Sequence, residues 1–434
     1  MKTCQYVSTT LVAALLFLLG TDHVLAQLTR TDSQIAYYQQ LIKRNPRNGK
    51  AFYGLGDALI RKARETGDPN YFNRAEEALK RSLEIAPKNA GAMRHLAYVF
   101  YSRHEFEAAA DHARKAIQIN PSDGDSYGVL GDALMEVGEY GMAEEVYKKM
   151  MELEENLYSY SRLAGLKSMR GDSMGAIVDL ERAVAAGKAA KQPPESIAWA
   201  EWQLGNDYFS LGKLEKAEAY YGQSLTTYPN YYRALAGMAQ VRAAQKRFDE
   251  AIDLYRKAVA MLPMPEYIAA LGDVYSKIEK SDEARKQYEL VEYIGKLNSL
   301  NKALYNRELA YFYADHDIKP KEGLELAQRE LEYRRDIYAY DVLAWNLYRN
   351  GKAEEAREEI NSALRLGTTD AKLFYHAGMI YHRLGDKPKA QKYLRRALET
   401  NPHFHILFAD EAARTLKTLE SSVSSALHRQ ANRR

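Results

Sequence analysis

Large apolar residues followed at once by a small residue recur along this chain at a nearly constant interval. The ten pairs are Leu55-Gly56, Leu96-Ala97, Leu130-Gly131, Leu163-Ala164, Leu204-Gly205, Met238-Ala239, Leu271-Gly272, Leu309-Ala310, Leu343-Ala344 and Ala377-Gly378, the last with Ala in the large position. Successive intervals are 41, 34, 33, 41, 34, 33, 38, 34 and 34 residues. A period near 34 residues is typical of stacked helical hairpins.

A second marker lies 12 residues after the small residue in most units. Nine of the ten units carry alanine there, at Ala75, Ala109, Ala143, Ala176, Ala217, Ala251, Ala284, Ala356 and Ala390, with a longer gap of 19 residues in the first unit. Four residues later most units place a larger apolar residue, such as Leu79, Tyr147, Tyr221, Tyr288 and Leu394. The pattern predicts two closely packed helices per unit, one of which needs small residues at the contact.

The combination of markers resembles the tetratricopeptide repeat. The unit AEWQLGNDYFSLGKLEKAEAYYGQSLTTYP matches that family's pattern at Leu204, Gly205, Tyr208, Ala217, Tyr221 and Pro229. The resemblance covers about residues 33–402. It implies an all-α, right-handed superhelical solenoid of about ten helical hairpins, with a concave groove lined by the first helix of each hairpin.

Breaks in the period predict how the chain is organised. We expect a signal peptide over residues 1–26, an N-terminal subarray over 27–190 with one leading helix, and a C-terminal subarray over 191–402. Pro193-Pro194 makes the stretch 186–196 the best candidate for a bend between the subarrays. Residues 403–434 are expected to supply a capping helix, which a solenoid needs to cover its last apolar face, and a disordered basic tail beyond Ser421.

The N-terminus has the features of a secretory signal. Lys2 precedes the apolar run Leu11–Leu19, and Val24-Leu25-Ala26 fits the small-residue cleavage rule, with cleavage after Ala26. An uncleaved anchor is the alternative, although the run is shorter than the roughly 20 residues that span a bilayer. Cleavage would remove Cys4, the one cysteine. We therefore expect a periplasmic or secreted protein without an integral membrane span.

Charge and motif content narrow the class of function. The net charge of +3 is too even for a nucleic-acid binder, so no nucleic-acid partner is expected. No phosphate-binding glycine loop, HExxH zinc motif or GxSxG elbow occurs, so we expect neither catalytic residues nor a cofactor. His376, His382, His403 and His405 cluster near the end, but they do not share one helical face, and no metal site is expected.

The resemblance also implies which positions face the groove, namely those six and three residues before the small residue and one and four after it. All three tryptophans fall there, and large exposed aromatics are typical of binding surfaces. The candidate groove residues are Tyr53, Tyr98, Tyr101, Trp199, Trp202, Asn206, Phe209, Arg307, Tyr311, Tyr338, Asp341, Trp345, Tyr348, Tyr375 and His382. The alternative is that these aromatics pack between units and stiffen the array.

These positions lead to a hypothesis about function. We expect a non-enzymatic scaffold of the bacterial envelope that binds an extended peptide or partner protein, with Trp199, Trp202, Phe209, Trp345 and Tyr348 as anchors. The lysine-and-asparagine pattern with which chaperone adaptors hold a peptide carboxylate is absent from these positions. Substituting Trp202 or Trp345 by Ala should weaken binding by about 2–4 kcal/mol and leave stability nearly unchanged. A polysaccharide ligand is the second hypothesis, because aromatic faces also stack on sugar rings.

Overall fold

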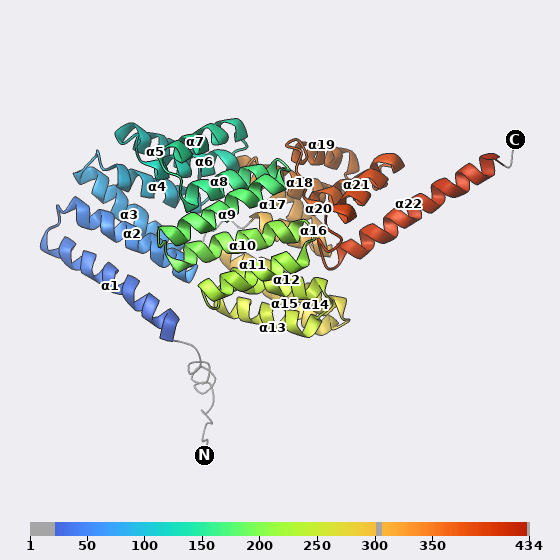
Figure 1. The fold of residues 1–434 in the computed structure, drawn as a ribbon, viewed down its shortest axis with the longest axis horizontal. Helices are drawn as coiled ribbons and strands as arrows, with labels where there is room; N and C mark the ends of the chain where they lie inside the picture. The colour runs from blue at the N-terminus through green and yellow to red at the C-terminus, as the bar shows by residue number, and fades with distance from the viewer. Residues whose placement is uncertain (1–21, 301–305, 432–434) are drawn as a thin grey trace, which may run out of the picture. The chain divides into compact units, whose positions relative to one another are not determined.

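The computed structural model describes residues 22–300 and 306–431, and the side chains within 31–297 and 307–421. Twenty-two α-helices and no strand occur in the described residues. Figure 1 labels these helices in chain order. Nine helix pairs form hairpins with one leading and one following helix, namely α2–α3 in the first part of the chain and the eight pairs from α6–α7 to α20–α21. The predicted all-α solenoid of about ten hairpins is confirmed.

The helix bounds follow the predicted units closely. They are α1 Asp22–Arg44, α2 Gly49–Thr66, α3 Asn70–Ile85, α4 Ala90–Ser102, α5 Phe106–Ile119, α6 Gly124–Glu136, α7 Tyr140–Leu153, α8 Leu157–Met169, α9 Ser173–Ala189, α10 Pro194–Ser210, α11 Leu214–Thr227, α12 Tyr232–Ala244, α13 Phe248–Met261, α14 Pro265–Lys277, α15 Ser281–Leu300, α16 Asn306–His316, α17 Pro320–Tyr333, α18 Ile337–Arg349, α19 Ala353–Ala363, α20 Ala371–Arg383, α21 Lys387–Thr400 and α22 Phe408–Ala431.

Contact between the two helices of a hairpin explains the recurring small residue. A Cβ atom placed on Gly205 would lie 2.4 Å from the Tyr221 ring, and one on Gly378 would lie 2.6 Å from Leu394. These partners are the larger residues that the sequence pattern places four positions after the marker alanine. The marker alanines are themselves buried, since Ala217 and Ala390 have no exposed surface. In hairpins with glycine in the small position, such as α10–α11 and α20–α21, the absence of a side chain on the first helix makes room for a large side chain of the second helix.

The chain divides into two compact units, and the division differs from the predicted one. Unit 1 comprises residues 1–99 and unit 2 residues 100–434. Across 186–196, where a bend was expected, one apolar core continues without a break and includes Ile177, Ile197 and Leu204. Pro193 and Pro194 cause no interruption, because they stand at the start of α10, where a missing backbone N–H costs nothing.

Within unit 2, hairpins far apart in sequence contact each other. The backbone N–H of Arg335 donates to the carbonyl oxygen of Glu136 at 2.8 Å, and that of Ile337 to the Tyr140 hydroxyl at 2.8 Å. Gly138 lies at this contact with φ of +81°, and a Cβ there would stand 2.5 Å from the Arg335 carbonyl oxygen. Glycine is required at this turn both for the left-handed backbone and for the close approach.

The two ends of the chain differ in part from the expectation. The leading helix α1 begins at Asp22 rather than near Asp32, so the backbone of Ala26 is helical. Residues 1–21 of the predicted signal peptide lie outside the described residues, and cleavage stays a prediction. At the other end, α22 continues to Ala431, where we expected disorder beyond Ser421. None of the described helices combines the length and apolarity needed to cross a membrane.

Candidate functional site on the inner face of unit 2

The first helices of successive hairpins in unit 2 contact one another, and we call the surface that they form the inner face. The contacting pairs are α6 with α8, α8 with α10, α10 with α12, α14 with α16, α16 with α18 and α18 with α20. The second helices of neighbouring hairpins contact each other less, as expected where the first helices line the concave side of a repeat array. Side chains of the first helices that point away from their own hairpin therefore project onto the inner face.

The open part of the inner face carries an arginine–aromatic cluster, formed by Trp199, Trp202, Tyr232, Arg233 and Tyr267 of α10, α12 and α14. All five side chains are half-buried. The Arg233 guanidinium lies 5.1 Å from the Trp202 ring centre and 5.2 Å from that of Tyr232. Tyr232 also approaches Tyr267, with 6.2 Å between ring centres.

A small apolar core beneath this cluster holds it in place. Tyr231 is 3% exposed and packs with Ala198 and Ala234, and both Trp199 and Trp202 rest against this core. Each tryptophan thus has one side packed and another accessible. The cluster is a preformed surface, because its rings are fixed by packing within the protein rather than by a ligand.

Acidic side chains adjoin the cluster without neutralising its arginine. No carboxylate of the described residues lies within ion-pair distance of Arg233. Glu266 is solvent-exposed, and partial desolvation by the surrounding helices raises the pKa of its carboxyl to about 7. Glu308 adds to this rise in pKa and Arg233 opposes it. At neutral pH, Glu266 therefore carries only part of a negative charge.

The other part of the inner face, along α16, α18 and α20, is covered by the chain's own C-terminal segment, residues 401–411. Phe408 stacks on Tyr375 with 5.1 Å between ring centres and meets Trp345 edge-on at 6.3 Å. The Tyr375 hydroxyl donates to Glu411 at 2.8 Å, and Lys277 pairs with Asp410 at 2.6 Å. We call this region the covered part.

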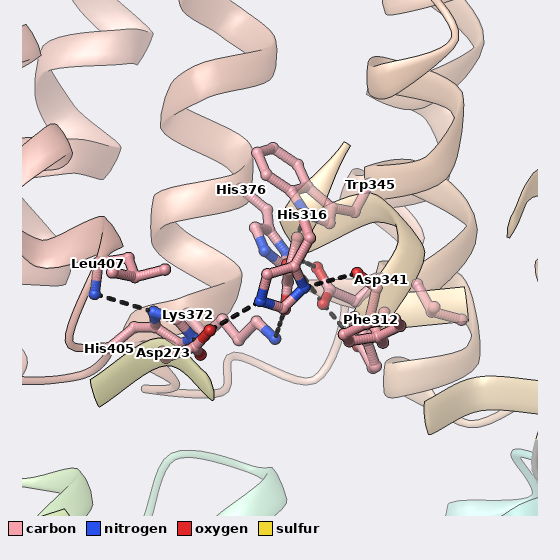
Figure 2. A network of polar contacts seen from close by, with 12 residues as sticks. Asp273, Phe312, His316, Asp341, Trp345, Lys372, His376, His405 and Leu407 are labelled. Carbon is pink, nitrogen blue, oxygen red and sulfur yellow. Dashed lines mark hydrogen bonds and ion pairs between the residues drawn. The ribbon is translucent and has the colours of Figure 1, made fainter. Parts of the chain in front are cut away.

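A polar network lies under the covered part, and Figure 2 shows its residues from close by. His316 Nε2 lies 2.7 Å from Asp273, whose other oxygen is 3.5 Å from His405 Nε2. His376 Nδ1 lies 2.9 Å from Asp341, and its ring stacks on Trp345 at 4.2 Å. The network joins α14, α16, α18 and α20 to the C-terminal segment.

Charges within the network shift the acidities of its members. Burial acts to raise the pKa of Asp315, but Lys372, His405, His376 and His316 outweigh burial and hold it at about 2. Lys372 reaches Asp315 at 3.0 Å, and the Trp345 indole donates to the same carboxylate at 2.8 Å. Burial lowers the pKa of His405 to about 4 despite the nearby Asp273. His405 is therefore neutral at physiological pH.

The structure corrects the expected exposure of five candidate residues. They are buried, with exposed fractions of 0% for Asp341, Trp345 and Tyr375, 5% for Phe209 and 8% for Tyr348. Trp345 fills space between α16, α18, α20 and the C-terminal segment, so it contributes to the core as the alternative interpretation held. The expectation that Trp345→Ala leaves stability unchanged assumed that the ring is exposed, and the structure shows that it is buried.

Nine other candidates are half-buried, namely Tyr53, Tyr98, Tyr101, Trp199, Trp202, Asn206, Arg307, Tyr311 and Tyr338, while His382 is exposed. Several of them already bind within the chain. Asn206 accepts from the Tyr221 hydroxyl at 2.8 Å, and Arg307 pairs with Asp336 at 2.6 Å. Tyr311 donates to Asp341 at 2.7 Å. Tyr53 lies in unit 1, where it stacks on His95 at 5.2 Å. The structure brings Trp199 and Trp202 together in one accessible cluster.

Sequence reasoning missed Tyr232, Arg233, Glu266 and Tyr267, although a signal for two of them was present. Arg233 and Glu266 stand six residues before the small residues Ala239 and Gly272, which is the position of Trp199 in its own unit. The same rule that selected the tryptophan would have selected both charged residues, but only aromatic occupants drew attention. Tyr232 and Tyr267 each lie one position from such a slot and carried no signal of their own.

The late histidines do not converge. His376 is buried beside Asp341, His382 is exposed, and His405 faces Asp273. No group of three or more potential metal ligands occurs among the residues that the structure describes.

Family models described as tetratricopeptide repeat match residues 24–74, 63–124, 124–157, 196–264 and 371–404, together more than half of the chain. A TPR repeat-containing protein of Methanocaldococcus jannaschii, MJ1428, is 22% identical over 340 residues, which are 77% of this chain and 54% of that protein. The CTR9 homolog of Arabidopsis thaliana is 27% identical over 46% of this chain and 19% of its own length.

Human protein O-mannosyl-transferase TMTC3 is 24% identical over 54% of this chain and 28% of its own length. This chain thus spans about half of MJ1428 and a smaller share of the other two relatives. Among solved structures, the human IFIT1 dimer with PPP-AAAA is 17% identical, with 78% of each chain covered and a TM-score of 0.49. Yeast Tom70 is 12% identical over 93% of this chain and 97% of its own, with a TM-score of 0.39.

Proposed function

This chain belongs to the tetratricopeptide repeat proteins, and on that premise we propose that it is a non-enzymatic scaffold that holds an extended segment of a partner protein on the inner face of unit 2. The observation that carries this proposal is the arginine–aromatic cluster. Trp199, Trp202, Tyr232 and Tyr267 are half-buried and lie together, whereas Trp345, Tyr348 and Tyr375 of the same face are buried.

The composition of the cluster favours a protein ligand. Tryptophan, tyrosine and arginine dominate the binding energy of protein interfaces, because they bury large areas with few rotatable bonds to freeze. The core of Tyr231, Ala198 and Ala234 already holds the rings in place. The scaffold therefore loses little conformational entropy on binding, and most of the entropy loss falls on the partner segment. Repeat scaffolds of this kind present one continuous surface over several hairpins.

The proposed location is the bacterial envelope, as a periplasmic or secreted protein. The support is the N-terminal pattern of Lys2, the apolar run Leu11–Leu19 and the small residue Ala26. Fractionation of cells that express the full chain, with sequencing of the mature N-terminus, tests this. A new N-terminus at Gln27 in the periplasm or medium is expected, and an intact N-terminus in the cytoplasm would contradict the assignment.

Binding is tested by affinity capture from the native envelope fraction with the chain from Gln27 onward and its Trp202→Ala variant. The matched control is Tyr293→Ala, which removes a 60% exposed aromatic from a second helix. A protein that the wild type and the control retain, and that Trp202→Ala loses by about 2–4 kcal/mol of binding energy, supports the proposal. Equal retention by all three chains would exclude this cluster as the site.

Oligosaccharide titration separates the glycan alternative. Saturable quenching of tryptophan fluorescence that disappears in Trp202→Ala would assign the cluster to sugars instead of protein. The arginine favours the protein ligand over the sugar, because a guanidinium pairs with an anionic group of a peptide, whereas a neutral sugar offers only a ring to stack on the aromatic side chains.

A further inference from the structure

We propose that the partner segment places an acidic side chain on Arg233, next to an aromatic or aliphatic residue that rests on Trp202 and Tyr267. This inference rests on the proposed function and adds the chemistry of the ligand: an internal aspartate or glutamate beside an apolar residue.

The contacts of Arg233 are with aromatic side chains rather than with a carboxylate. The guanidinium carbon lies 5.1 Å from the Trp202 ring centre and 5.2 Å from that of Tyr232. Arg233 also hydrogen-bonds to the Tyr232 side chain, which opposes the rise in the Tyr232 pKa caused by burial. The N–H groups of a guanidinium lie in its plane and point outward from the edge, where they match the two oxygens of a carboxylate. The hydrogen bond to Tyr232 uses part of the five N–H donors of the guanidinium, and the others are available to a carboxylate of a ligand.

Comparison with other arginines of the inner face shows what is missing at Arg233. Arg162 holds Asp132 through two hydrogen bonds of 2.8 Å each, and Arg307 holds Asp336 at 2.6 Å and Glu330 at 3.2 Å. Among the described residues no carboxylate takes the corresponding place at Arg233. A half-buried guanidinium has lost part of its hydration, so an incoming carboxylate gains more there than at an exposed arginine.

The covered part of the same face provides a precedent for the ligand. There the C-terminal segment brings Phe408 onto Tyr375, with Asp410 on Lys277 and Glu411 on the Tyr375 hydroxyl. An aromatic residue followed two and three positions later by carboxylates is thus already bound by this array of first helices. The arginine–aromatic cluster offers the same two kinds of contact, one apolar and one cationic, to a segment from another molecule.

Glu266 limits how acidic the ligand can be. Its carboxyl and that of Glu308 lie near the cluster, so a second acidic group in the segment would meet like charge. One carboxylate placed on Arg233 is favoured, and a run of acidic residues is not.

The test is selection of a random twelve-residue peptide library, displayed with its C-terminal end blocked, on the chain from Gln27 onward. Selected peptides are then synthesised with amidated C-termini and measured by fluorescence anisotropy. We expect enrichment of one Asp or Glu near an aromatic or aliphatic residue. Exchange of that acid for its amide, or Arg233→Gln, should each weaken binding by about 10- to 100-fold.

Arg233→Lys, which keeps the charge and loses the paired donors, should weaken binding less than Arg233→Gln, and Tyr293→Ala should have no effect. Thermal unfolding of each variant, followed by circular dichroism, shows that the fold is retained.

If selected peptides need Trp202 but lack an acid, or bind Arg233→Gln as well as wild type, this inference is wrong while the proposed function stands. If the selected peptides fail to bind as amides and bind only when they are synthesised with a free C-terminal carboxylate, the carboxylate comes from a chain end and the side-chain assignment is wrong. If binding is indifferent to Trp202, the proposed function fails.

Discussion

Trp202 and Trp345 occupy two groove-facing slots in different repeats, and their surroundings differ completely. Trp202 lies three residues before the small residue Gly205, and Trp345 lies one residue after the small residue Ala344. Trp202 is half-buried and faces the surface beside Arg233. Trp345 has no exposed surface and is enclosed by His376, Tyr348 and Phe408. The difference is the C-terminal segment, which crosses the covered part and leaves the arginine–aromatic cluster open. A repeat position fixes which face a side chain is on, and a distant segment decides whether that face is accessible.

The largest expected effect is on the covered part. Trp345→Ala removes a fully buried ring and the indole donor to Asp315, and should cost about 3–5 kcal/mol of unfolding free energy. Trp202→Ala removes a half-buried ring and should cost well under half as much. Urea unfolding of both variants checks this, with the transition followed by circular dichroism. Equal losses would mean that the two regions are equally buried in solution and would remove the contrast.

A smaller effect should be shared by both regions, because their hairpins are packed alike. Gly205→Ala in the open part and Gly378→Ala in the covered part each place a Cβ within 2.6 Å of a side chain of the second helix. Each should destabilise by about 1–3 kcal/mol. The control is Gly222→Ala on the outer helix α11, where nothing lies within 4 Å and helix propensity predicts a gain of about 0.5–1 kcal/mol. Opposite signs in the urea midpoints are expected, and a gain at Gly205 would refute the packing argument.

The smallest effect on global stability should come from a lower pH, which weakens the docking of the C-terminal segment on the covered part. The pKa of His405 is about 4 in the folded chain, below its ordinary value of 6.5. As the pH falls, His405 is therefore protonated at a higher pH in the undocked segment than in the docked one. Docking is therefore unaffected above pH 6.5 and weakens progressively between pH 6.5 and 4. The charged groups around His405 are Asp273, Asp315, Lys372 and His316, and the raised pKa of His316 keeps it protonated through this window.

Hydrogen exchange of the backbone amides of residues 404–411 measures this docking as a function of pH. Protection, corrected for intrinsic exchange rates, should fall as pH drops from 6.5 to 4.5, while amides of α10 keep theirs. A His405→Gln variant, which cannot titrate, should show a flat profile. A wild-type profile as flat as that of the variant would rule out His405 as the source.

The sequence predicted most of the fold because the information is local and repeated. The residues of a unit are enough to predict its hairpin, because a small residue, such as Gly205, is followed 16 positions later by the larger residue that packs against it, such as Tyr221. Ten repetitions made the pattern unmistakable. The sequence predicted a bend at Pro193-Pro194, but Pro193 is the N-cap of α10 and Pro194 its first residue, and the apolar core continues past them.

The candidate site was predicted in part. Trp199 and Trp202 are half-buried residues of the first helix of their hairpin, and their role in binding stays a prediction. Arg233 and Glu266 stand in the same kind of slot and were overlooked, because charged residues on a helix are ordinary and only their neighbours make them unusual. Arg233 is distinctive through the rings of Trp202 and Tyr232 and through the lack of a carboxylate, and neither feature is a property of its own repeat.

By itself the sequence determined the all-α hairpin array and the face onto which each slot projects, since both follow from a helical period and from contacts within one unit. Only the tertiary structure decided which slots remain open. The contact of Arg335 with Glu136, about 200 residues away in sequence, and the placement of Phe408 on Tyr375 join parts of the chain that no repeat period relates. Accessibility depends on such long-range contacts, and so the tertiary structure buried Trp345 and left Trp202 available for binding.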